Sequence, residues 1–227
     1  MITSGMERIL IIAPHADDEV LGCGGLIEKA CRFNNHVKVV VMTVGDVKHP
    51  HSTEIVTGET RKKELKDAMG FLGCTDFGVV YNDKDSILDT VPRLEIISKL
   101  DEIITNYLPT MIFIPLPSYH QDHNILFESC FAALRPKPNQ LIKLIAMYEY
   151  PLISWQYQKF WNTGELYVDI TDTIQKKIGA FQMHKSQMRP PNHLISPENV
   201  KKWAEMRGME IGVAYAEKYY ILRSQIL

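Results

Sequence analysis

The sequence predicts a single α/β domain in which helices cover both faces of a mostly parallel sheet. Short apolar runs, typical of buried strands, alternate four times with longer segments of helical periodicity. Such alternation favours parallel strands joined by right-handed crossovers. The length of 227 residues also suits one domain, because a chain of this size hides roughly 70% of its unfolded surface.

Four apolar runs are the predicted core strands: 8–13, 37–43, 77–81 and 111–114. Four segments with apolar residues at helical spacing are the predicted helices: about 20–34, 58–72, 91–107 and 122–134. Asp89 and Thr90, with Pro92 in the first turn, indicate where the third helix begins. We expect a Rossmann-like three-layer sandwich with the strand order 3-2-1-4, in which the first and fourth strands are neighbours.

The pattern weakens after Arg135, so the single domain 1–227 divides into a core, 1–135, and a C-terminal part, 136–227. The C-terminal part contains two predicted strands, 141–148 and 166–170, and two predicted helices, 172–183 and 197–207. A long loop is expected between 150 and 165, and long loops in compact domains are often functional.

Composition excludes several classes of protein. Of the residues, 45% are apolar and 23% charged, and the formal net charge of −2 comes with no basic face for nucleic acid. No apolar run approaches the ~20 residues of a membrane span, and no signal peptide is recognisable, so we expect a cytoplasmic protein without stable membrane insertion. Its four cysteines form no CxxC pair, which favours reduced buried thiols.

Two polar clusters follow predicted strands. PHADDEVLGCGG, 14–25, comes directly after the first strand, and HQDH, 120–123, comes after the fourth. In the 3-2-1-4 order these strands are adjacent, and ligands of such sheets bind at the carboxyl ends of the strands where the order reverses. Topology therefore places the two clusters at one site.

The combined site holds three histidines and three aspartates: His15, Asp17, Asp18, His120, Asp122 and His123. So many acidic groups would repel one another unless a divalent cation compensated them. Two imidazoles and one carboxylate form a common catalytic zinc set, and a carboxylate adjacent in sequence would then stay free as a base. The alternative for Asp17 or Asp122 alone is to cap the helix that follows.

The glycines of the first cluster raise a second alternative, dinucleotide binding. Gly22, Gly24 and Gly25 lack the GxGxxG spacing, and acidic residues precede them where a pyrophosphate would lie. We therefore expect these glycines to let the helix pack closely on the sheet.

At these motifs the sequence resembles the PIG-L/LmbE-like family of zinc-dependent N-deacetylases, which act on N-acetylglucosamine in glycoconjugates. PHADDE at 14–19 and HQDH at 120–123 match the two histidine motifs of the family, although Ala16 replaces a common proline. Weaker similarities extend over most of the chain: Arg61, Glu64, Ala68 and Leu72–Gly73, then 168–187 and 207–220.

The resemblance implies specific roles. His15, Asp18 and His123 would ligate Zn²⁺, although a His₂Asp set also accepts Fe²⁺ or Co²⁺. Asp17 would act as the general base. His120 would remain unligated beside the scissile carbonyl as a protonated imidazole, and Asp122 would orient it.

Three further residues are candidates for substrate binding: Arg61, Asp83 and His184. Each has an ordinary alternative, respectively a solvated arginine, a turn aspartate and a surface histidine at a helix end. Trp155 and Trp161 could stack on sugar rings or pack within the loop, and His49 and His51 lie in a polar loop. Whether the loops 45–56 and 150–165 form a lid stays open.

These expectations favour a metal-dependent hydrolase that removes the N-acetyl group from an N-acetylglucosamine-type sugar or glycoconjugate. The alternatives are an amidase for another N-acylated sugar or thiol-sugar conjugate, and a non-catalytic sugar-binding module. A spare carboxylate at Asp17 argues against the binding module, because binding a sugar needs no base beside a metal. The expected partner is a small N-acetylated sugar, and the resemblance also implies homo-oligomers.

Overall fold

The computed structural model describes residues 2–48, 55–138, 140–152 and 163–226, so the predictions for His49, His51, Trp155, Trp161 and most of the two loops lie outside it. The main sheet has seven strands in the order β5-β2-β1-β6-β7-β9-β8. Their bounds are β1 Arg8–Ala13, β2 His36–Thr43, β5 Asp76–Tyr81, β6 Met111–Pro115, β7 Leu144–Tyr148, β8 Gly164–Asp169 and β9 Ala216–Ser224. A separate two-stranded sheet pairs β3, Val47–Lys48, with β4, Ile55–Val56.

The first five strands of the main sheet are parallel, whereas β9 runs antiparallel to both β7 and β8. The order β5-β2-β1-β6 confirms the predicted 3-2-1-4 arrangement of the four core strands. Register matches Ile9 of β1 to Met111 of β6, so the carboxyl ends of these two strands lie next to each other.

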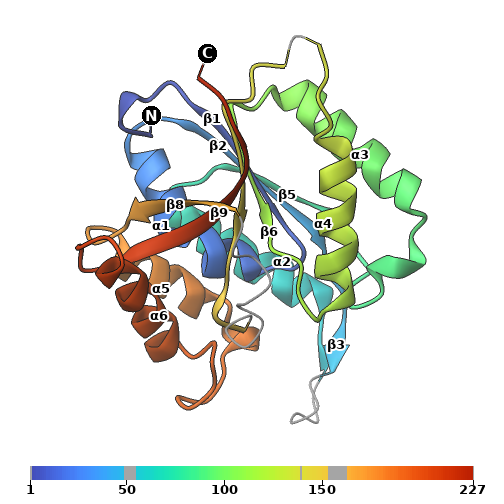
Figure 1. The fold of residues 1–227 in the computed structure, drawn as a ribbon. Coiled ribbons are helices and arrows are strands. Elements are labelled where there is room, and N and C mark those ends of the chain that lie inside the picture. The colour runs from blue at the N-terminus through green and yellow to red at the C-terminus, as the bar shows by residue number, and fades with distance from the viewer. Residues whose placement is uncertain (1, 49–54, 139, 153–162, 227) are drawn as a thin grey trace.

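Six α-helices flank the sheet: α1 Asp18–Arg32, α2 Gly58–Leu72, α3 Arg93–Tyr107, α4 Gln121–Ala133, α5 Ile174–Met183 and α6 Pro197–Met209. Helices α3 and α4 pack together on one face, at the right of Figure 1, and α1, α2, α5 and α6 contact one another on the other face. Short 3₁₀ turns occur at η1 Ile2–Ser4, η2 Leu88–Thr90 and η4 Lys185–Gln187. The third predicted helix begins two residues later than expected, because Pro92 is its N-cap.

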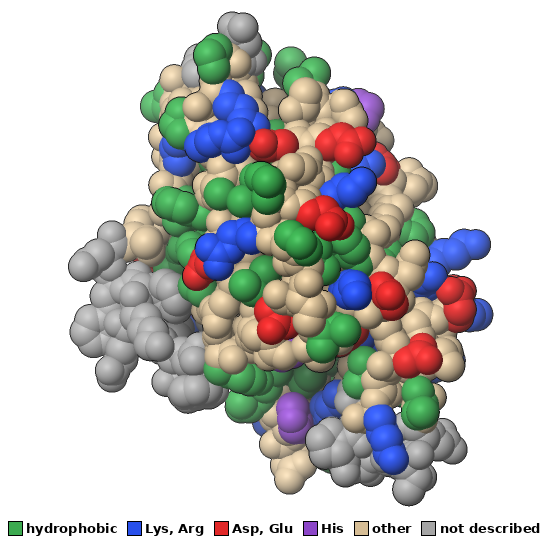
Figure 2. Space-filling view, turned by 90° about the vertical axis from the view of Figure 1, so that its right-hand side faces the viewer, with side chains coloured by type: hydrophobic (Ala, Val, Ile, Leu, Met, Phe, Trp, Pro, Cys, Tyr) green, Lys and Arg blue, Asp and Glu red, His purple; other side chains and the backbone are tan. Residues whose placement is uncertain are grey.

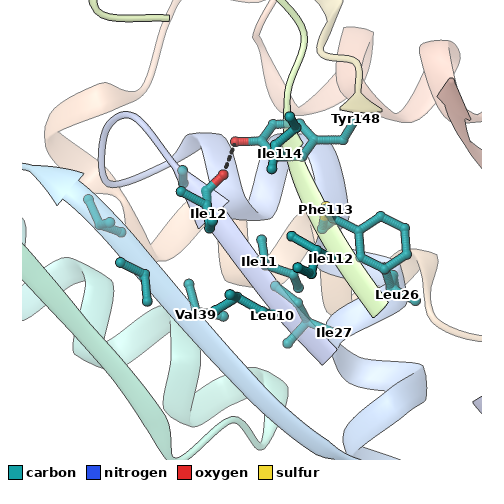
Figure 3. Packing of buried hydrophobic residues seen from close by; sticks show 14 of the residues in the cluster. Leu10, Ile11, Ile12, Leu26, Ile27, Val39, Ile112, Phe113, Ile114 and Tyr148 are labelled. Carbon is teal, nitrogen blue, oxygen red and sulfur yellow. Dashed lines mark hydrogen bonds between the residues drawn. The ribbon is translucent and has the colours of Figure 1, made fainter. Parts of the chain in front are cut away.

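The core lies on both faces of the central strands, against helix α1 on one side and helices α3 and α4 on the other. Side chains from Ile9 to Ala13 are fully buried, as are Leu26 and Ile27 of α1. Figure 3 shows Leu10, Ile11 and Ile12 of β1 beside Ile112, Phe113 and Ile114 of β6, with Leu26 and Ile27 of α1 close by. The hydroxyl of Tyr148 donates a hydrogen bond to the carbonyl of Ile12 at 3.1 Å, which ties β7 to the end of β1 (Figure 3).

Helix α1 approaches its neighbours so closely that it has no room for side chains at two positions. A β-carbon on Gly22 would lie 2.1 Å from a ring carbon of Tyr148. A β-carbon on Gly25 would lie 2.5 Å from the side chain of Ile170. The close packing expected from the glycine-rich stretch is therefore what the structure shows.

A buried ion pair joins α5, β9 and the middle of α1. The ammonium group of Lys177 lies 2.6 Å from Oε1 of Glu217 and donates to the carbonyl of Leu21 at 2.7 Å. The Glu217 carboxylate accepts hydrogen bonds from the backbone N–H groups of Gly25 and Leu26. Strand β9 was not predicted, because the charged residue Glu217 interrupts its apolar pattern. The ion pair with Lys177 explains how Glu217 can nevertheless be buried.

The outer face of α3 and α4 carries mixed side chains. Figure 2 shows this face, where basic, acidic and hydrophobic side chains alternate and no single charge predominates. Within the described ranges, no helix has both the length and the apolar character needed to cross a membrane.

Candidate metal centre

The two polar clusters meet at the carboxyl ends of β1 and β6. The first occupies the turn from β1 into α1, and the second forms the start of α4, directly after the β6 loop. The imidazole rings of His15 and His120 lie 4.9 Å apart, and those of His15 and His123 lie 5.5 Å apart, measured between ring centroids. Residues about a hundred positions apart are thus neighbours, as the topology predicts.

Two imidazoles converge on one carboxylate oxygen. Oδ2 of Asp18 lies 3.3 Å from Nδ1 of His15 and 3.3 Å from Nε2 of His123. The ligand atoms of these three residues lie within 4.8 Å of one another, and all three side chains are buried. This is the geometry of a His₂Asp set around a shared centre.

The other nitrogen of His15 is held by a second carboxylate. Nε2 of His15 lies 2.8 Å from Oδ2 of Asp122. Asp122 is itself fixed by the backbone N–H groups of Ser86, at 2.7 Å, and Leu88, at 3.0 Å. A carboxylate on Nε2 leaves Nδ1, on the side of Asp18, as the nitrogen that could ligate a cation once its proton has left, which is how a metal-ligating histidine is usually oriented. The donor set therefore fits a divalent cation.

This arrangement differs from the predicted role of Asp122. We expected its carboxylate to orient His120, but the carboxylate contacts His15 instead. The contact with His120 comes from the backbone: the N–H of Asp122 donates to Nδ1 of His120 at 3.3 Å, which makes His120 the N-cap of α4. Because Nδ1 accepts this hydrogen bond, Nε2 is the nitrogen that carries the proton of the neutral His120 ring.

Charge and burial shift the pKa values of these groups apart. Burial alone would lower the pKa of His15, but hydrogen bonds to Asp122 and Asp18 raise it to about 10. Burial alone would raise the pKa of Asp18, but His123 and His15 hold it well below its usual range. Burial, together with the neighbouring His15 and His123, lowers the pKa of His120. A cation at this centre would displace the His15 proton, because ligating imidazoles are neutral.

Asp17 stands beside the three convergent side chains and has an unusual backbone. Its φ of 142° lies in the region that favours glycine, and such a conformation costs about 1–3 kcal/mol. Asp17 is the N-cap residue of α1, yet its side chain makes no capping hydrogen bond to the helix in the described chain. Burial and the charge of Asp18 raise the pKa of Asp17 to about 7.

The buried pair of Glu19 and His184 holds the backbone of Asp17 in place. Oε2 of Glu19 accepts the backbone N–H of Asp17 at 2.9 Å, and Oε1 of Glu19 lies 3.0 Å from Nε2 of His184. Both side chains are fully buried. Burial alone would lower the pKa of His184, but Glu19 raises it. His184 therefore contacts Glu19 rather than the cluster itself. Neither His184 nor Glu19 lines the cavity beside the cluster.

A cavity of about 230 Å³ opens onto the metal centre. Arg61 lies in its wall with 3% of its surface exposed, paired through Nη1 with Asp85 and donating from Nη2 to the carbonyl of Ala16 at 3.2 Å. The predicted Asp83 is exposed and does not line the cavity, whereas Asp85 does. The two aspartates belong to one turn, in which Ser86 has a φ of 63°.

Sequence reasoning also missed several residues of this cavity. Tyr150 packs its ring 5.0 Å from that of His123 and donates its hydroxyl to Ser118 Oγ at 3.1 Å. Gln187 and Arg189 reach the cavity from the segment after α5. No motif signalled these positions. The family-like stretch 168–187 pointed to this segment only as a whole.

The fold and the site define an α/β protein with a mostly parallel sheet and a His–Asp–His cluster at its carboxyl edge. A family model described as GlcNAc-PI de-N-acetylase, PIG-L, matches residues 10–134, and the chain belongs to this family of deacetylases.

Relatives agree with this assignment over most of the chain. The chain is 29% identical over 199 residues to the uncharacterized deacetylase YaiS of Escherichia coli, covering 82% of this chain and 96% of the relative. It is similar to the N,N'-diacetylchitobiose deacetylase from Pyrococcus horikoshii, with a TM-score of 0.74 and 25% identity over 95% of this chain and 84% of that one. The fold alone also occurs in GalB, the 4-carboxy-2-hydroxymuconate hydratase of Pseudomonas putida, with a TM-score of 0.75, 19% identity and coverage of 98% of both chains.

Proposed function

We propose that this protein is a metal-dependent amide hydrolase that removes the acetyl group from an N-acetylglucosamine-type sugar or glycoconjugate. The observation that carries the proposal is the convergence of His15, Asp18 and His123 at a cavity that the uncapped side chain of Asp17 also lines. Support for the substrate class comes from the family description and from the diacetylchitobiose deacetylase, both of which name N-acetylated amino sugars.

The proposed ligands are His15, Asp18 and His123. A bound Zn²⁺, Fe²⁺ or Co²⁺ would supply Lewis-acid polarisation of the acetyl carbonyl and lower the pKa of the attacking water. Asp122 holds His15 in the tautomer that ligation needs.

Asp17 is the proposed general base. It takes a proton from the attacking water as the oxygen of that water adds to the acetyl carbon. His120 donates a hydrogen bond from Nε2 to the developing oxyanion, because its Nδ1 accepts the backbone N–H of Asp122. Asp17 then returns the proton to the sugar nitrogen as the C–N bond breaks, so acetate and the free amine leave.

Arg61 and Asp85 form the proposed contact with sugar hydroxyls. They are paired with each other at the cavity wall, so together they present both donors and an acceptor to a hydroxyl-rich ligand. In this proposal Asp85 takes the place predicted for Asp83. His184 becomes a supporting residue rather than a direct substrate contact.

The experiment is amine release from a panel of N-acylated sugars by the metal-loaded protein. We expect acetate and amine in equal amounts from N-acetylglucosamine or N,N'-diacetylchitobiose, and loss of both after chelation. Asp17→Asn is the matched control, because it keeps the size of the side chain and removes the base. Larger N-acyl groups on the same sugars distinguish an amidase of another specificity. Metal-bound protein that binds these sugars and releases no amine would establish the non-catalytic binding module instead.

A further inference from the structure

Two of the four cysteines, far apart in sequence, lie together at the opposite edge of the sheet from the metal centre. Cys31 is in the last turn of α1, and Cys74 follows the C-cap of α2 and precedes β5. Both are free thiols, and both line the same surface cavity. Neither takes part in the proposed reaction.

The backbone brings these thiols together. Gly73 adopts φ 79° at the end of α2 and turns the chain toward α1. A β-carbon placed on Gly73 would lie 3.7 Å from Cβ of Cys31, so the chain just before Cys74 runs along the end of α1. The thiol of Cys74 also makes weak contacts to the carbonyls of Val37, at 3.7 Å, and Asp76, at 3.6 Å. The pair is thus seated between two helix ends and two strand starts.

The two thiols have different access to solvent. Cys31 is partly exposed, whereas Cys74 is 2% exposed. Both line a surface cavity of about 420 Å³ together with polar residues such as Asn34, His36 and Asp76. The neighbouring Cys74 lowers the pKa of Cys31, whereas Cys31 and burial raise the pKa of Cys74. Cys31 therefore has the accessibility of an attacking thiol, and Cys74 the buried position of a resolving one.

The other two cysteines differ in both respects. Cys23 and Cys130 have no exposed surface, and burial raises their pKa values. They match the reduced buried thiols that the sequence predicts for all four cysteines, and they serve as internal controls for the pair.

We propose that Cys31 and Cys74 form a redox-active dithiol that closes to an intrachain disulfide by exchange with a low-molecular-weight disulfide. The Cys31 thiolate attacks one sulfur of the small disulfide and releases one small thiol, which leaves a mixed disulfide on Cys31. Cys74 then loses its proton and attacks the Cys31 sulfur, which releases the second small thiol. The two protein thiols are oxidised by two electrons, and the small disulfide is reduced to two thiols.

The disulfide would link the end of α1 to the turn between α2 and β5. A cross-link that closes a long loop restricts the unfolded chain, so the oxidised protein should unfold at a higher temperature than the reduced one. The proposed metal ligands lie at the other ends of the strands, so deacetylation should proceed at the same rate in both forms.

The test exposes the full-length, fully reduced protein to glutathione disulfide under native conditions, followed by acid quenching and mass spectrometry. We expect the wild-type protein to lose two hydrogens without retaining glutathione, and a peptide map to show the Cys31–Cys74 link. Cys74→Ser should retain one glutathione on Cys31. Cys31→Ser should react more slowly by about tenfold or more, because its remaining pair member is buried. Cys130→Ser is the matched control and should form the same disulfide as the wild type.

Three results would overturn the proposal. One is a wild-type protein that keeps a stable glutathione adduct on Cys31 while Cys74 stays reduced. Another is a Cys31→Ser variant that acquires glutathione on Cys74 at the wild-type rate. The third is a disulfide that forms only after denaturation, which circular dichroism of the same samples would reveal. A rise in the unfolding temperature on oxidation of the wild type, absent in both serine variants, would support the proposal independently.

Discussion

Nε2 of His184 lies 3.0 Å from Oε1 of Glu19, and the second carboxylate oxygen of Glu19 receives the backbone N–H of Asp17. Through Glu19, His184 near the C-terminal end of the chain is thus connected to Asp17, the residue proposed as the general base. Because Asp17 has a positive φ, its backbone needs such a partner to stay in place.

Glu19→Ala should therefore lower kcat by about 10–100-fold while leaving KM and metal content close to wild type. The reason is that the carboxylate of Asp17 loses its fixed orientation, although it remains in the protein. Glu19→Gln keeps an oxygen for the Asp17 N–H and should recover part of the activity. Steady-state kinetics combined with metal analysis measure both effects. Equal kcat values for Glu19→Ala and the wild type would remove Glu19 from this role.

The same pair predicts a pH dependence of stability. The pKa of His184 is raised in the folded protein, so the folded state binds this proton more tightly than the unfolded state. Its contribution is fully present below the unfolded pKa of about 6.5 and declines as pH rises through the folded pKa. Urea unfolding in the presence of chelator, for wild type and His184→Gln, should show a stability difference that shrinks with increasing pH. A difference that grows with pH would contradict the assignment.

Substitutions of Asp17 should affect activity and stability in different ways. Asp17→Asn should reduce kcat by about 10²–10⁴-fold with the metal retained. Among inactive variants, Asp17→Gly should be more stable than Asp17→Ala by about 1 kcal/mol, because only glycine adopts the φ of 142° without strain. Denaturant unfolding of the two variants measures this difference. Ala and Gly of equal stability would mean that the backbone relaxes at this position.

Metal removal should destabilise the folded protein. Binding to the folded state alone adds about 2.7 kcal/mol at a metal concentration a hundred times the dissociation constant. We therefore expect chelator to lower the unfolding temperature of the wild type and to leave that of His123→Ala unchanged. Differential scanning calorimetry with and without Zn²⁺ makes the comparison. A wild type indifferent to chelator would argue against a bound cation.

The glycines of α1 offer a matched packing test. Gly22→Ala places a β-carbon 2.1 Å from the ring of Tyr148 and should destabilise the protein by about 1–3 kcal/mol. Gly70 in α2 has nothing within 4 Å of the same position, so Gly70→Ala should instead stabilise by about 0.5–1 kcal/mol. Urea unfolding of the two variants should give changes of opposite sign.

The strand order and the proximity of the two histidine clusters could be predicted from sequence. Apolar periodicity identifies the strands locally, and each cluster directly follows one of two strands that are neighbours in the expected order. The contacts of Asp122 could not be predicted, since they depend on the backbone N–H groups of Ser86 and Leu88, which come from a different loop. The choice of Asp85 over Asp83 is likewise set by the path of a turn. Strand β9 was missed because the ion pair that compensates Glu217 is formed with Lys177, a residue of another element.

The pairing of β1 with β6 also constrains the order of folding events. An N-terminal fragment that ends before β6 contains His15 and Asp18 but neither His123 nor Asp122. Capture of a cation by the proposed ligands would therefore begin only once β6 and the start of α4 have docked. In kinetic experiments the uptake of metal should report the completion of the central sheet rather than its initiation.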